Sequence, residues 1–482
     1  MSGPDQTFLT AAAALLGVRG FTCDPELMAP WLTDWRGRYT GQACALASPA
    51  NTAEVAALVA LCTAHGVAIV PQGGNSGMSG GATPDASGAA LLLSLRRLDQ
   101  IGSIDCAARQ VTCGAGVVLQ HLHDAADAAG LRFPLTLGGK GSATVGGLIA
   151  TNAGGSQVLR HGSMRAQVLG LEAVLADGTV WSALTPLKKD NRGFDLKQLF
   201  IGSEGTLGII TAATLKLEPA VAHCTVVWAG MASIGAAREL LLQAEAALGD
   251  ALEGFEVLPQ NCLEAVLTNV PSARAPLREA HAWHALIELA SSDPADDLAG
   301  QAEQLLAATL AGGIIQDATI AASEGQAEAF WALREAISGA LRAKGAAVQH
   351  DIAVPVPQMA EFVTMAIPTI ERAWPGCRAF GFGHLGDGNV HFHVTAPPGA
   401  VRGEWEPGDG KEISRMVHDL VTQWHGTISA EHGIGQMKRD ELTRLGDPVA
   451  LDLLMQVKVA LDPAGLLNPG KLLTLAPRGA NA

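Results

Sequence analysis

The stretch PQGGNSGMSGG at residues 71–81 decides the fold of this 482-residue chain. It directly follows an apolar run at residues 67–70 that has the length of a short buried strand. Glycines permit positive φ angles and close backbone approach, so successive N–H groups in this loop can form a nest for a diphosphate. The spacing is not G-x-G-x-x-G and no helix pattern follows, which argues against a Rossmann loop. A plain surface loop is the remaining alternative.

Two further blocks of small residues favour an extended ligand. Residues 137–155 read LGGKGSATVGGLIATNAGG, which holds seven glycines and little charge. Residues 201–210 read IGSEGTLGII and again bring small residues just before a strand. Three such loops in one domain predict a single dinucleotide laid along the backbone.

The residues around these loops indicate an α+β fold. NTAE at residues 51–54 resembles a capping box, and apolar residues at helical spacing follow it up to Gly66. ADG at residues 176–178 lies between two apolar runs and predicts a hairpin. Farther on, strands alternate with Ala/Glu-rich helices such as 234–248 and 294–311.

These patterns predict two α+β domains with extra segments at both ends. We expect an N-terminal segment at 1–39, a ligand-binding domain at 40–220 and a second domain at 221–430. The segment 431–482 contains a helix followed by LLNPGK, and we expect it to pack back on the first domain.

Composition and charge exclude several protein classes. The formal net charge is −15 and no basic run appears, so we expect no nucleic-acid binding. The eight cysteines form no C-x-x-C pair, which argues against a zinc ribbon, an iron–sulfur site and a disulfide framework. The N-terminus lacks a basic signal-peptide region, and no apolar run reaches the roughly 18–20 residues of a membrane span. We therefore expect a cytoplasmic protein with reduced thiols.

A histidine-rich strand in the second domain predicts a metal site. In GFGHLGDGNVHFHV at residues 381–394, alternation directs Asn389, His391 and His393 to one face of a strand, and the glycines let His384 fold back beside His391. ISAEHGIG at residues 428–435 offers a carboxylate and another histidine. Two histidines and one carboxylate suit a catalytic divalent metal with open positions. A non-haem iron site, or unrelated polar strand residues, are the alternatives.

The helix WALREAIS at residues 331–338 offers an anion clamp. Arg334 and Ser338 lie four residues apart and share one face, and an arginine can bind a carboxylate with two hydrogen bonds. A solvated surface arginine is the alternative. Against it, no acidic residue lies three or four positions away on either side of Arg334.

The glycine blocks resemble the FAD-binding domain of the vanillyl-alcohol oxidase type flavoproteins. From Trp35 to Lys471 the chain is most similar to D-2-hydroxyglutarate dehydrogenases, and also to D-lactate dehydrogenases and the glycolate oxidase flavin subunit. The resemblance implies a two-part FAD-binding domain, a substrate or cap domain, and a C-terminal segment that completes the active site. Covalent relatives attach flavin through His or Cys; we assign that role to no position here, so we expect non-covalent FAD.

The resemblance also implies which residues bind the cofactor. The loop 72–77 would hold the pyrophosphate, residues of the second block would line the flavin, and the tail would reach the cofactor through its asparagine. The residues expected to bind FAD are Pro71, Gln72, Gly73, Gly74, Asn75, Ser76, Gly77, Met78, Leu137, Gly138, Gly141, Ser142, Gly146, Gly147, Ala150, Thr151, Asn152, Gly154, Gly155, Ile210 and Asn468.

Matching H-L-G-D-G-N-x-H and A-E-H-G stretches in these relatives imply the catalytic roles. His384, His391 and Glu431 match metal ligands that bind zinc in the D-2-hydroxyglutarate enzymes. His432 matches the catalytic base and Asn389 a substrate-contacting amide. In hydroxy-acid relatives an Arg with Ser or Thr four residues later binds the substrate, as Arg334 and Ser338 would here.

Two positions depart from the pattern of the D-2-hydroxyglutarate enzymes. Gln349 stands where they have Lys, and His393 stands where they have Asn. The departures remove one fixed cation and alter one polar contact, so they affect the expected substrate more than the reaction class. A protonated His393 would restore the charge.

The expected function is an FAD- and metal-dependent dehydrogenase of a D-2-hydroxy acid, with D-2-hydroxyglutarate the leading substrate. The metal would lower the pKa of the hydroxyl, neutral His432 would take its proton, and flavin N5 would accept the hydride. The alternatives are a D-lactate or glycolate type dehydrogenase or oxidase and, from another class, a non-catalytic nucleotide- or metal-binding protein. We expect an external electron acceptor, such as an electron-transfer flavoprotein, a quinone or another carrier, and a homodimer is compatible with the sequence.

Overall fold

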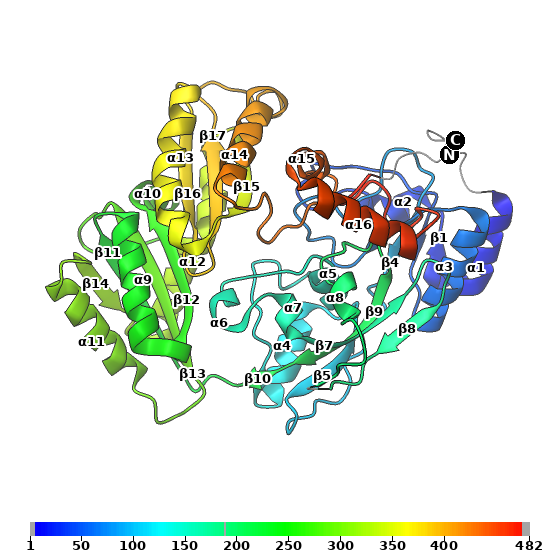
Figure 1. Ribbon diagram of the computed structural model, residues 1–482, viewed down its shortest axis with the longest axis horizontal. Helices are drawn as coiled ribbons and strands as arrows, with labels where there is room; N and C mark the ends of the chain where they lie inside the picture. Colours follow the sequence, from blue (N-terminus) through cyan, green and yellow to red (C-terminus); the bar gives the residue numbers. More distant parts are fainter. Residues whose placement is uncertain (1–4, 188, 475–482) are drawn as a thin grey trace. The chain divides into compact units, whose positions relative to one another are not determined.

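The computed structural model describes residues 5–187 and 189–474, and the chain divides into two compact units (Figure 1). The first unit comprises Met1–Gly154, Gly162–Pro219 and Glu431–Ala482, and the second comprises Gly155–His161 and Ala220–Ala430. Both units mix helices and strands, so the expected α+β class is confirmed. The domain limits expected from the sequence stay a prediction.

The first sheet of the first unit contains the strand that leads into the first glycine loop. Its order is β1 (Phe21–Thr22), β2 (Ala45–Ala47), β4 (Leu91–Ser94) and β3 (Ile69–Gln72), and β2, β4 and β3 are parallel. The helix α3 (Thr52–His65) begins at Asn51, whose side chain accepts a hydrogen bond from the Glu54 N–H, and it ends at Gly66 in the left-handed conformation. The expected N-cap and glycine stop are therefore confirmed, and the Glu54 side chain accepts from the N–H of Ala50, one residue before the cap.

The second sheet of this unit is antiparallel, in the order β5 (Gln110–Gly114), β9 (Ile209–Lys216), β7 (Val168–Val174) and β8 (Val180–Ala183). The pair β7–β8 is the expected hairpin across residues 176–178. A two-stranded ladder joins β6 (Leu131–Arg132) to β10 (Glu218–Pro219). The other helices are α1 (Gln6–Gly20), α2 (Pro25–Met28), α4 (Leu119–Ala128), α5 (Val145–Ala150), α7 (Met164–Gln167) and α8 (Lys197–Phe200).

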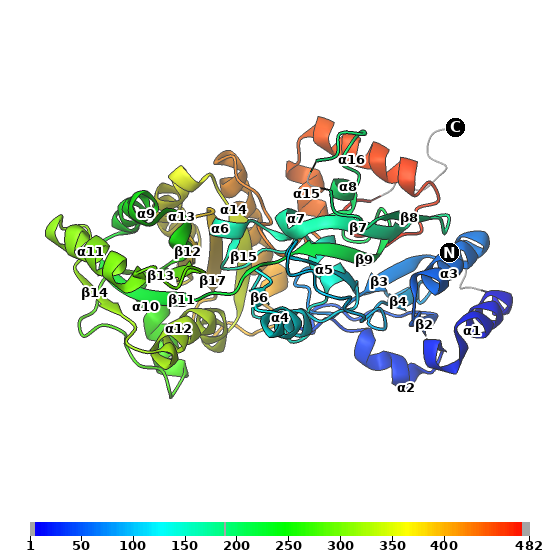
Figure 2. The same cartoon turned by 90° about the horizontal axis from the view of Figure 1, so that it is seen from below.

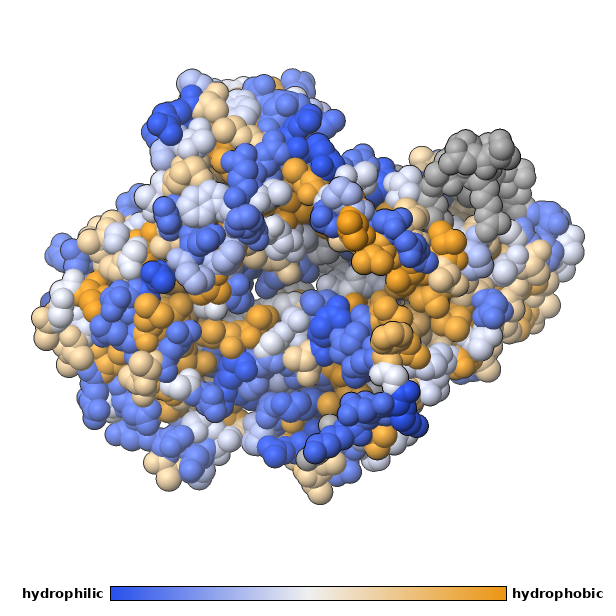
Figure 3. All heavy atoms as spheres, viewed as in Figure 1, coloured by the Kyte–Doolittle hydropathy of each residue, from blue (hydrophilic) through white to orange (hydrophobic). Residues whose placement is uncertain are grey.

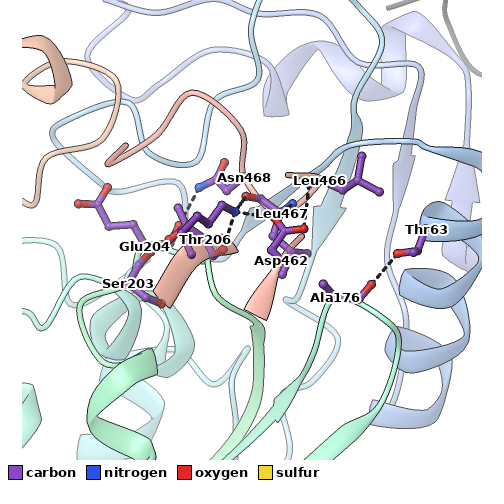
Figure 4. Close-up of polar contacts among 10 residues, drawn as sticks. Thr63, Ala176, Ser203, Glu204, Thr206, Asp462, Leu466, Leu467 and Asn468 are labelled. Carbon is purple, nitrogen blue, oxygen red and sulfur yellow. Dashed lines mark hydrogen bonds and ion pairs between the residues drawn. The ribbon is translucent and has the colours of Figure 1, made fainter. Parts of the chain in front are cut away.

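The C-terminal segment packs back on the first unit, as expected from the sequence. The helices α15 (Arg439–Leu445) and α16 (Pro448–Leu461) lead to a short bridge in which Leu467 pairs with Ile69 of β3. Figure 4 shows Asp462, Leu467 and Asn468 beside Thr206 and Glu204. The tail is therefore part of the same core as the glycine loops.

The helix α16 also presents an apolar outer surface. Val449, Leu453 and Leu454 are exposed, and Figure 3 shows hydrophobic residues gathered over this helix. Val457 and Leu461 of the same helix pack against the core of the second sheet. Among the described residues, no helix is both long and apolar enough to cross a membrane.

The second unit is built on one antiparallel sheet of seven strands, in the order β14-β11-β13-β12-β16-β17-β15. Helices cover both of its faces, with α10 and α12 on one face and α9, α11, α13 and α14 on the other (Figure 2). The strands are β11 (His223–Met231), β12 (Leu252–Pro259), β13 (Trp283–Ser291), β14 (Asp317–Ile320), β15 (Ala347–Ala353), β16 (Arg378–His384) and β17 (Asn389–Thr395). The helices are α6 (Val158–His161), α9 (Ile234–Leu248), α10 (Gln260–Asn269), α11 (Leu298–Ala311), α12 (Glu324–Ala343), α13 (Met359–Ala373) and α14 (Lys411–Gln423).

Side chains alternate along β17 between a polar face and an apolar face that packs in the core. Val390, Phe392 and Val394 are fully buried, and the Phe392 ring packs against Phe362 of α13. The residues between them face α12, where Phe382 of β16 contacts both His391 and His393. The alternation expected from the sequence is therefore present.

Candidate active site

The first two glycine blocks pack directly against each other in the first unit. A Cβ on Gly74 would lie 1.8 Å from the Ser142 carbonyl oxygen, and a Cβ on Gly73 would lie 2.2 Å from Thr144 Oγ1. Arg96, which the sequence did not single out, donates hydrogen bonds to the carbonyls of Gly73 and Gly74 at 3.2 and 3.0 Å. These glycines therefore serve the close approach of two loops.

Other glycines in the same blocks face open space. A Cβ on Gly77, Gly138 or Gly141 would meet no atom within 4 Å. Loop packing therefore does not require glycine at these positions, whereas a ligand lying along the backbone would. These positions leave room for a ligand along the backbone.

Three buried polar atoms border these loops without a hydrogen-bond partner among the described residues. They are Gln72 Oε1, Thr144 Oγ1 and Asn468 Oδ1. The amide nitrogen of Asn468 donates to the carbonyls of Gly81 and Glu204, so its oxygen is directed elsewhere. Because buried polar atoms are normally paired, these atoms fit the polar groups of a bound FAD.

Some residues expected to bind the cofactor have structural contacts as well. Gly146 lies against Ala115, where a Cβ would come within 2.6 Å of the alanine side chain. The Asn152 side-chain oxygen accepts hydrogen bonds from Ser163 Oγ and the Arg165 N–H. Ile210 is buried in β9 and Gly155 groups with the second unit. The other residues expected to bind FAD lie in the first two glycine blocks or, for Asn468, in the C-terminal tail, and their roles stay predictions.

The segment that carries His432 is anchored to the first glycine loop. Ser79 Oγ donates to the backbone carbonyl of His432 at 3.1 Å. The Glu204 carboxylate accepts hydrogen bonds from the N–H groups of Ile434 and Gly435, both at 2.7 Å. Burial raises the pKa of Glu204 above its ordinary value, although these two N–H groups oppose the shift. The backbone beside the predicted base is therefore held by the same loops that fit the cofactor.

In the second unit, the hairpin of β16 and β17 brings the predicted metal-binding histidines together. His384 pairs with Asn389 in the ladder, and the rings of His384 and His391 lie 5.3 Å apart between centroids. Burial lowers the pKa of His391 well below its ordinary value, and Arg334 and His384 lower it further. This shift favours the neutral imidazole, which is the form that binds metals.

Glu431 supplies the carboxylate of this predicted ligand set. It is bonded to Ala430, the last residue of the second unit, whose N–H donates to the Asp351 carbonyl. Ligand atoms of His384, His391 and Glu431 all lie within 4.8 Å of one another. This separation and the two nitrogen donors fit a divalent cation.

Asn389 begins β17, where it pairs with His384 of β16 on one side and with Ala353 of β15 on the other. It is 3% exposed, and its amide nitrogen donates to Asp351 Oδ1 at 3.0 Å and to the Ile352 carbonyl at 2.9 Å. Its side-chain oxygen has no hydrogen-bond partner among the described residues. The sequence did not identify Asp351, but this aspartate fixes the amide so that Asn389 Oδ1 is available to accept from a ligand hydroxyl.

Arg334 is buried, not solvated, and it has a partner that the sequence did not reveal. Its side chain lies over the Phe382 ring at 5.1 Å, and its Nε donates to Glu256 Oε2 at 2.7 Å. Glu256 is 1% exposed and also contacts Nδ1 of His384. Burial by itself would raise the pKa of Glu256, but Arg334 and His384 outweigh it and hold the pKa below its usual range.

The two positions that depart from the family pattern lie together near the C-terminal half of α12. Gln349 and His393 face each other in the ladder, with Gln349 Nε2 3.4 Å from His393 Nδ1. Gln349 Nε2 also lies 3.5 Å from the backbone carbonyl of Ser338. One end of this site therefore presents an amide and an imidazole group, while Arg334 lies elsewhere in the same cluster as a fixed cation.

Two family models match this chain. A model described as FAD linked oxidases, C-terminal domain, matches residues 221–472, and one described as FAD binding domain matches residues 43–183. The chain belongs to the FAD-linked oxidase family.

Several relatives of this chain are named dehydrogenases. It is 39% identical over 456 residues to the mitochondrial D-2-hydroxyglutarate dehydrogenase of Bos taurus, covering 93% of this chain and 80% of the relative. It is 36% identical over 441 residues to the D-2-hydroxyglutarate dehydrogenase of Xanthomonas citri pv. viticola, covering 91% of each chain. The expected kinship with FAD-linked D-2-hydroxy-acid dehydrogenases is confirmed, and the chain is an FAD-linked oxidoreductase.

A solved structure supports the fold of this chain. The structure of p-cresol methylhydroxylase with substrate bound superposes with a TM-score of 0.74 at 15% identity, covering 98% of both chains. The expected two-part FAD-binding fold with a second α+β domain is thereby confirmed. The name of the Bos taurus relative places that protein in mitochondria, and the cytoplasmic location of this chain stays a prediction.

Proposed function

We propose that this FAD-linked oxidoreductase oxidises a D-2-hydroxy acid to the 2-oxo acid with the help of a divalent metal, and that D-2-hydroxyglutarate is the leading substrate. The buried polar cluster at the His384 end of the second unit carries the proposal, because it combines metal-binding nitrogens with an arginine beside them. The names of the relatives support the choice of substrate.

In this proposal, each residue of the cluster has one task. His384, His391 and Glu431 hold the cation, which we expect to be zinc. Arg334 binds the carboxylate of the substrate through the ends of its guanidinium, since its Nε is already engaged by Glu256. Asn389 and Ser338 orient the remaining oxygens of the substrate by hydrogen bonds.

Proton transfer is assigned to His432. A neutral imidazole at this position accepts the proton of the substrate hydroxyl as the C–H bond is broken. Ser79 fixes the His432 backbone through its carbonyl, and this fixes the point from which the side chain extends. When bound, the metal would polarise the hydroxyl oxygen and non-covalent FAD would accept the hydride.

The uncharged amide of Gln349 beside His393 favours a second substrate class. The distal carboxylate of a five-carbon diacid gains from a fixed cation, and Lys stands at the Gln349 position in the D-2-hydroxyglutarate enzymes. A shorter acid such as D-lactate or glycolate does not require this cation.

The external electron acceptor (an electron-transfer flavoprotein, a quinone or another carrier) and a homodimer are parts of the same proposal.

Anaerobic reduction of the purified flavoprotein by a panel of D- and L-2-hydroxy acids tests this function. We expect bleaching of the oxidised flavin absorbance by D-2-hydroxy acids and a marked loss of rate after treatment with a chelator. Absence of bleaching with every acid would contradict the proposal. Stopped-flow mixing of the reduced protein with oxygen separates a dehydrogenase, which reoxidises slowly, from an oxidase.

A further inference from the structure

We propose that Glu256 is a positioning residue that sets the geometry of two functional groups at once, the metal ligand His384 and the carboxylate-binding Arg334. The inference rests on the proposed function, because it assigns a role to a residue behind that site. Glu256 itself would touch neither the metal nor the substrate.

The sheet fixes Glu256 opposite His384. The strands β12 and β16 are antiparallel neighbours, and Glu256 and His384 are direct partners in their register. Glu256 is 1% exposed, and its Oε1 contacts Nδ1 of the His384 ring. Since a carboxylate only accepts hydrogen bonds, this contact requires the hydrogen of the imidazole to be on Nδ1.

That hydrogen position determines what His384 offers to a cation. With the hydrogen on Nδ1, the lone pair of the ring is on Nε2, and the carboxylate fixes the orientation of the ring. Metal-binding histidines commonly donate their other N–H to a carboxylate, and loss of that partner costs about 10–100-fold in metal affinity. Glu256 thus prepares His384 as a ligand.

The second oxygen of Glu256 positions the anion clamp. Glu256 Oε2 accepts from Nε of Arg334 at 2.7 Å, and Arg334 lies over the Phe382 ring at 5.1 Å. These contacts hold the plane of the guanidinium and occupy its inner edge. The two terminal nitrogens remain as the fork that a carboxylate binds. One buried carboxylate therefore contacts both the metal ligand His384 and the clamp residue Arg334, and it fixes their positions relative to each other.

A buried acid on the same strand provides a matched control. Glu253 is also 1% exposed and also pairs with an arginine, since its Oε2 lies 2.9 Å from Nη1 of Arg160. Its Oε1 accepts from Gln157. If Glu256 were only a structural ion-pair partner of the same kind, substitution of either acid would have the same consequences.

Zn²⁺ affinity of the intact flavoprotein tests the proposal. Chelator-treated, FAD-loaded wild type, Glu256→Gln and Glu253→Gln are titrated with Zn²⁺ by calorimetry, and their Co²⁺ forms are compared by electron paramagnetic resonance. Glutamine presents an amide N–H₂ or a neutral oxygen to His384 and cannot fix the ring as a carboxylate does. We expect the dissociation constant for Zn²⁺ to rise about 10–100-fold in Glu256→Gln, with an altered Co²⁺ spectrum, and to be unchanged in Glu253→Gln.

The outcomes separate this inference from the proposed function. If the wild type binds Zn²⁺, His384→Ala abolishes binding and Glu256→Gln binds as tightly as the wild type, the positioning role is overturned while the metal site stands. If the wild type binds no Zn²⁺ at all, both fall. Should Glu256→Gln not fold with FAD, Glu256→Asp is titrated instead. Its carboxylate is one methylene farther from His384, so weakened Zn²⁺ binding supports the proposal and wild-type binding overturns it.

Discussion

Replacement of Lys458 by methionine should strongly destabilise the first unit. Lys458 Nζ donates three hydrogen bonds, to Asp462 Oδ2 at 2.5 Å, the Thr206 carbonyl at 2.7 Å and the Leu467 carbonyl at 2.9 Å. Lys458 is 5% exposed and Asp462 is fully buried. Figure 4 shows Thr206, Asp462 and Leu467 meeting at this point. The ammonium therefore joins the end of α16 to the third glycine loop and to Leu467, the tail residue that pairs with β3.

The expected loss of unfolding free energy follows from the Asp462 carboxylate, which the substitution leaves buried without its cation. Methionine is similar in length but donates no hydrogen bond, so Asp462 keeps only the N–H groups of Leu466 and Leu467 as partners. Removal of one partner of a buried ion pair costs about 3–5 kcal/mol of unfolding free energy. At roughly 2–4 °C per kcal/mol for a domain of this size, the melting temperature should fall by about 6–20 °C.

Thermal unfolding followed by circular dichroism and by flavin fluorescence measures this change. Lys216→Met is the control, because Lys216 pairs with Glu218 at 2.5 Å with about half of its side chain exposed. An exposed pair contributes about 0–1 kcal/mol, so this variant should melt within a few degrees of the wild type. A Lys458→Met protein that melts with the Lys216→Met control would refute the reasoning that the buried ammonium holds the tail.

Three further predictions concern the second unit. Arg334→Lys keeps the charge but loses the planar fork, so kcat/KM for the preferred D-2-hydroxy acid should fall by about 10–100-fold, and an unchanged value would remove Arg334 from the site. Chelation should lower steady-state activity by about 100-fold without releasing FAD, and Zn²⁺ should restore it; activity that survives removal of all metal would contradict the metal role. Burial, and to a smaller extent His281, lowers the pKa of His284 to about 4. As the pH falls, His284 is therefore protonated in the unfolded state before it is protonated in the folded state. The stability that neutral His284 contributes is present above about pH 6.5 and is lost as the pH falls toward 4, a change of about 3 kcal/mol in the unfolding free energy. Denaturant titrations at several pH values should show this slope reduced in His284→Asn, and equal slopes would disprove it.

Local patterns predicted most of the elements near the glycine loops. Asn51 and Glu54 cap α3 as the sequence indicated, and Gly66 ends this helix. Both depend on residues within one or two helical turns, so a short stretch of sequence contains the whole interaction. Alternation along residues 389–394 likewise predicted which side chains of β17 enter the core.

Local sequence patterns could not predict the partners of Arg334 and His384. An absence of acids three or four positions from Arg334 correctly excluded a helical ion pair, but Glu256 lies 78 residues away in the sequence. Only the pairing of β12 with β16 brings this acid to His384. Asp351 similarly reaches Asn389 across the β15–β17 ladder.

The sequence by itself determined the FAD-binding class of this protein, because three glycine blocks predict a bound dinucleotide, and its histidine-rich strand predicted where a cation site would be. The tertiary structure decided how that chemistry is supported. The carboxylates of Glu256 and Asp351 and the ammonium of Lys458 act on groups that are near only after the strands and the tail have assembled. Strand register and burial fix these contacts, and neither property can be read from a local stretch of residues.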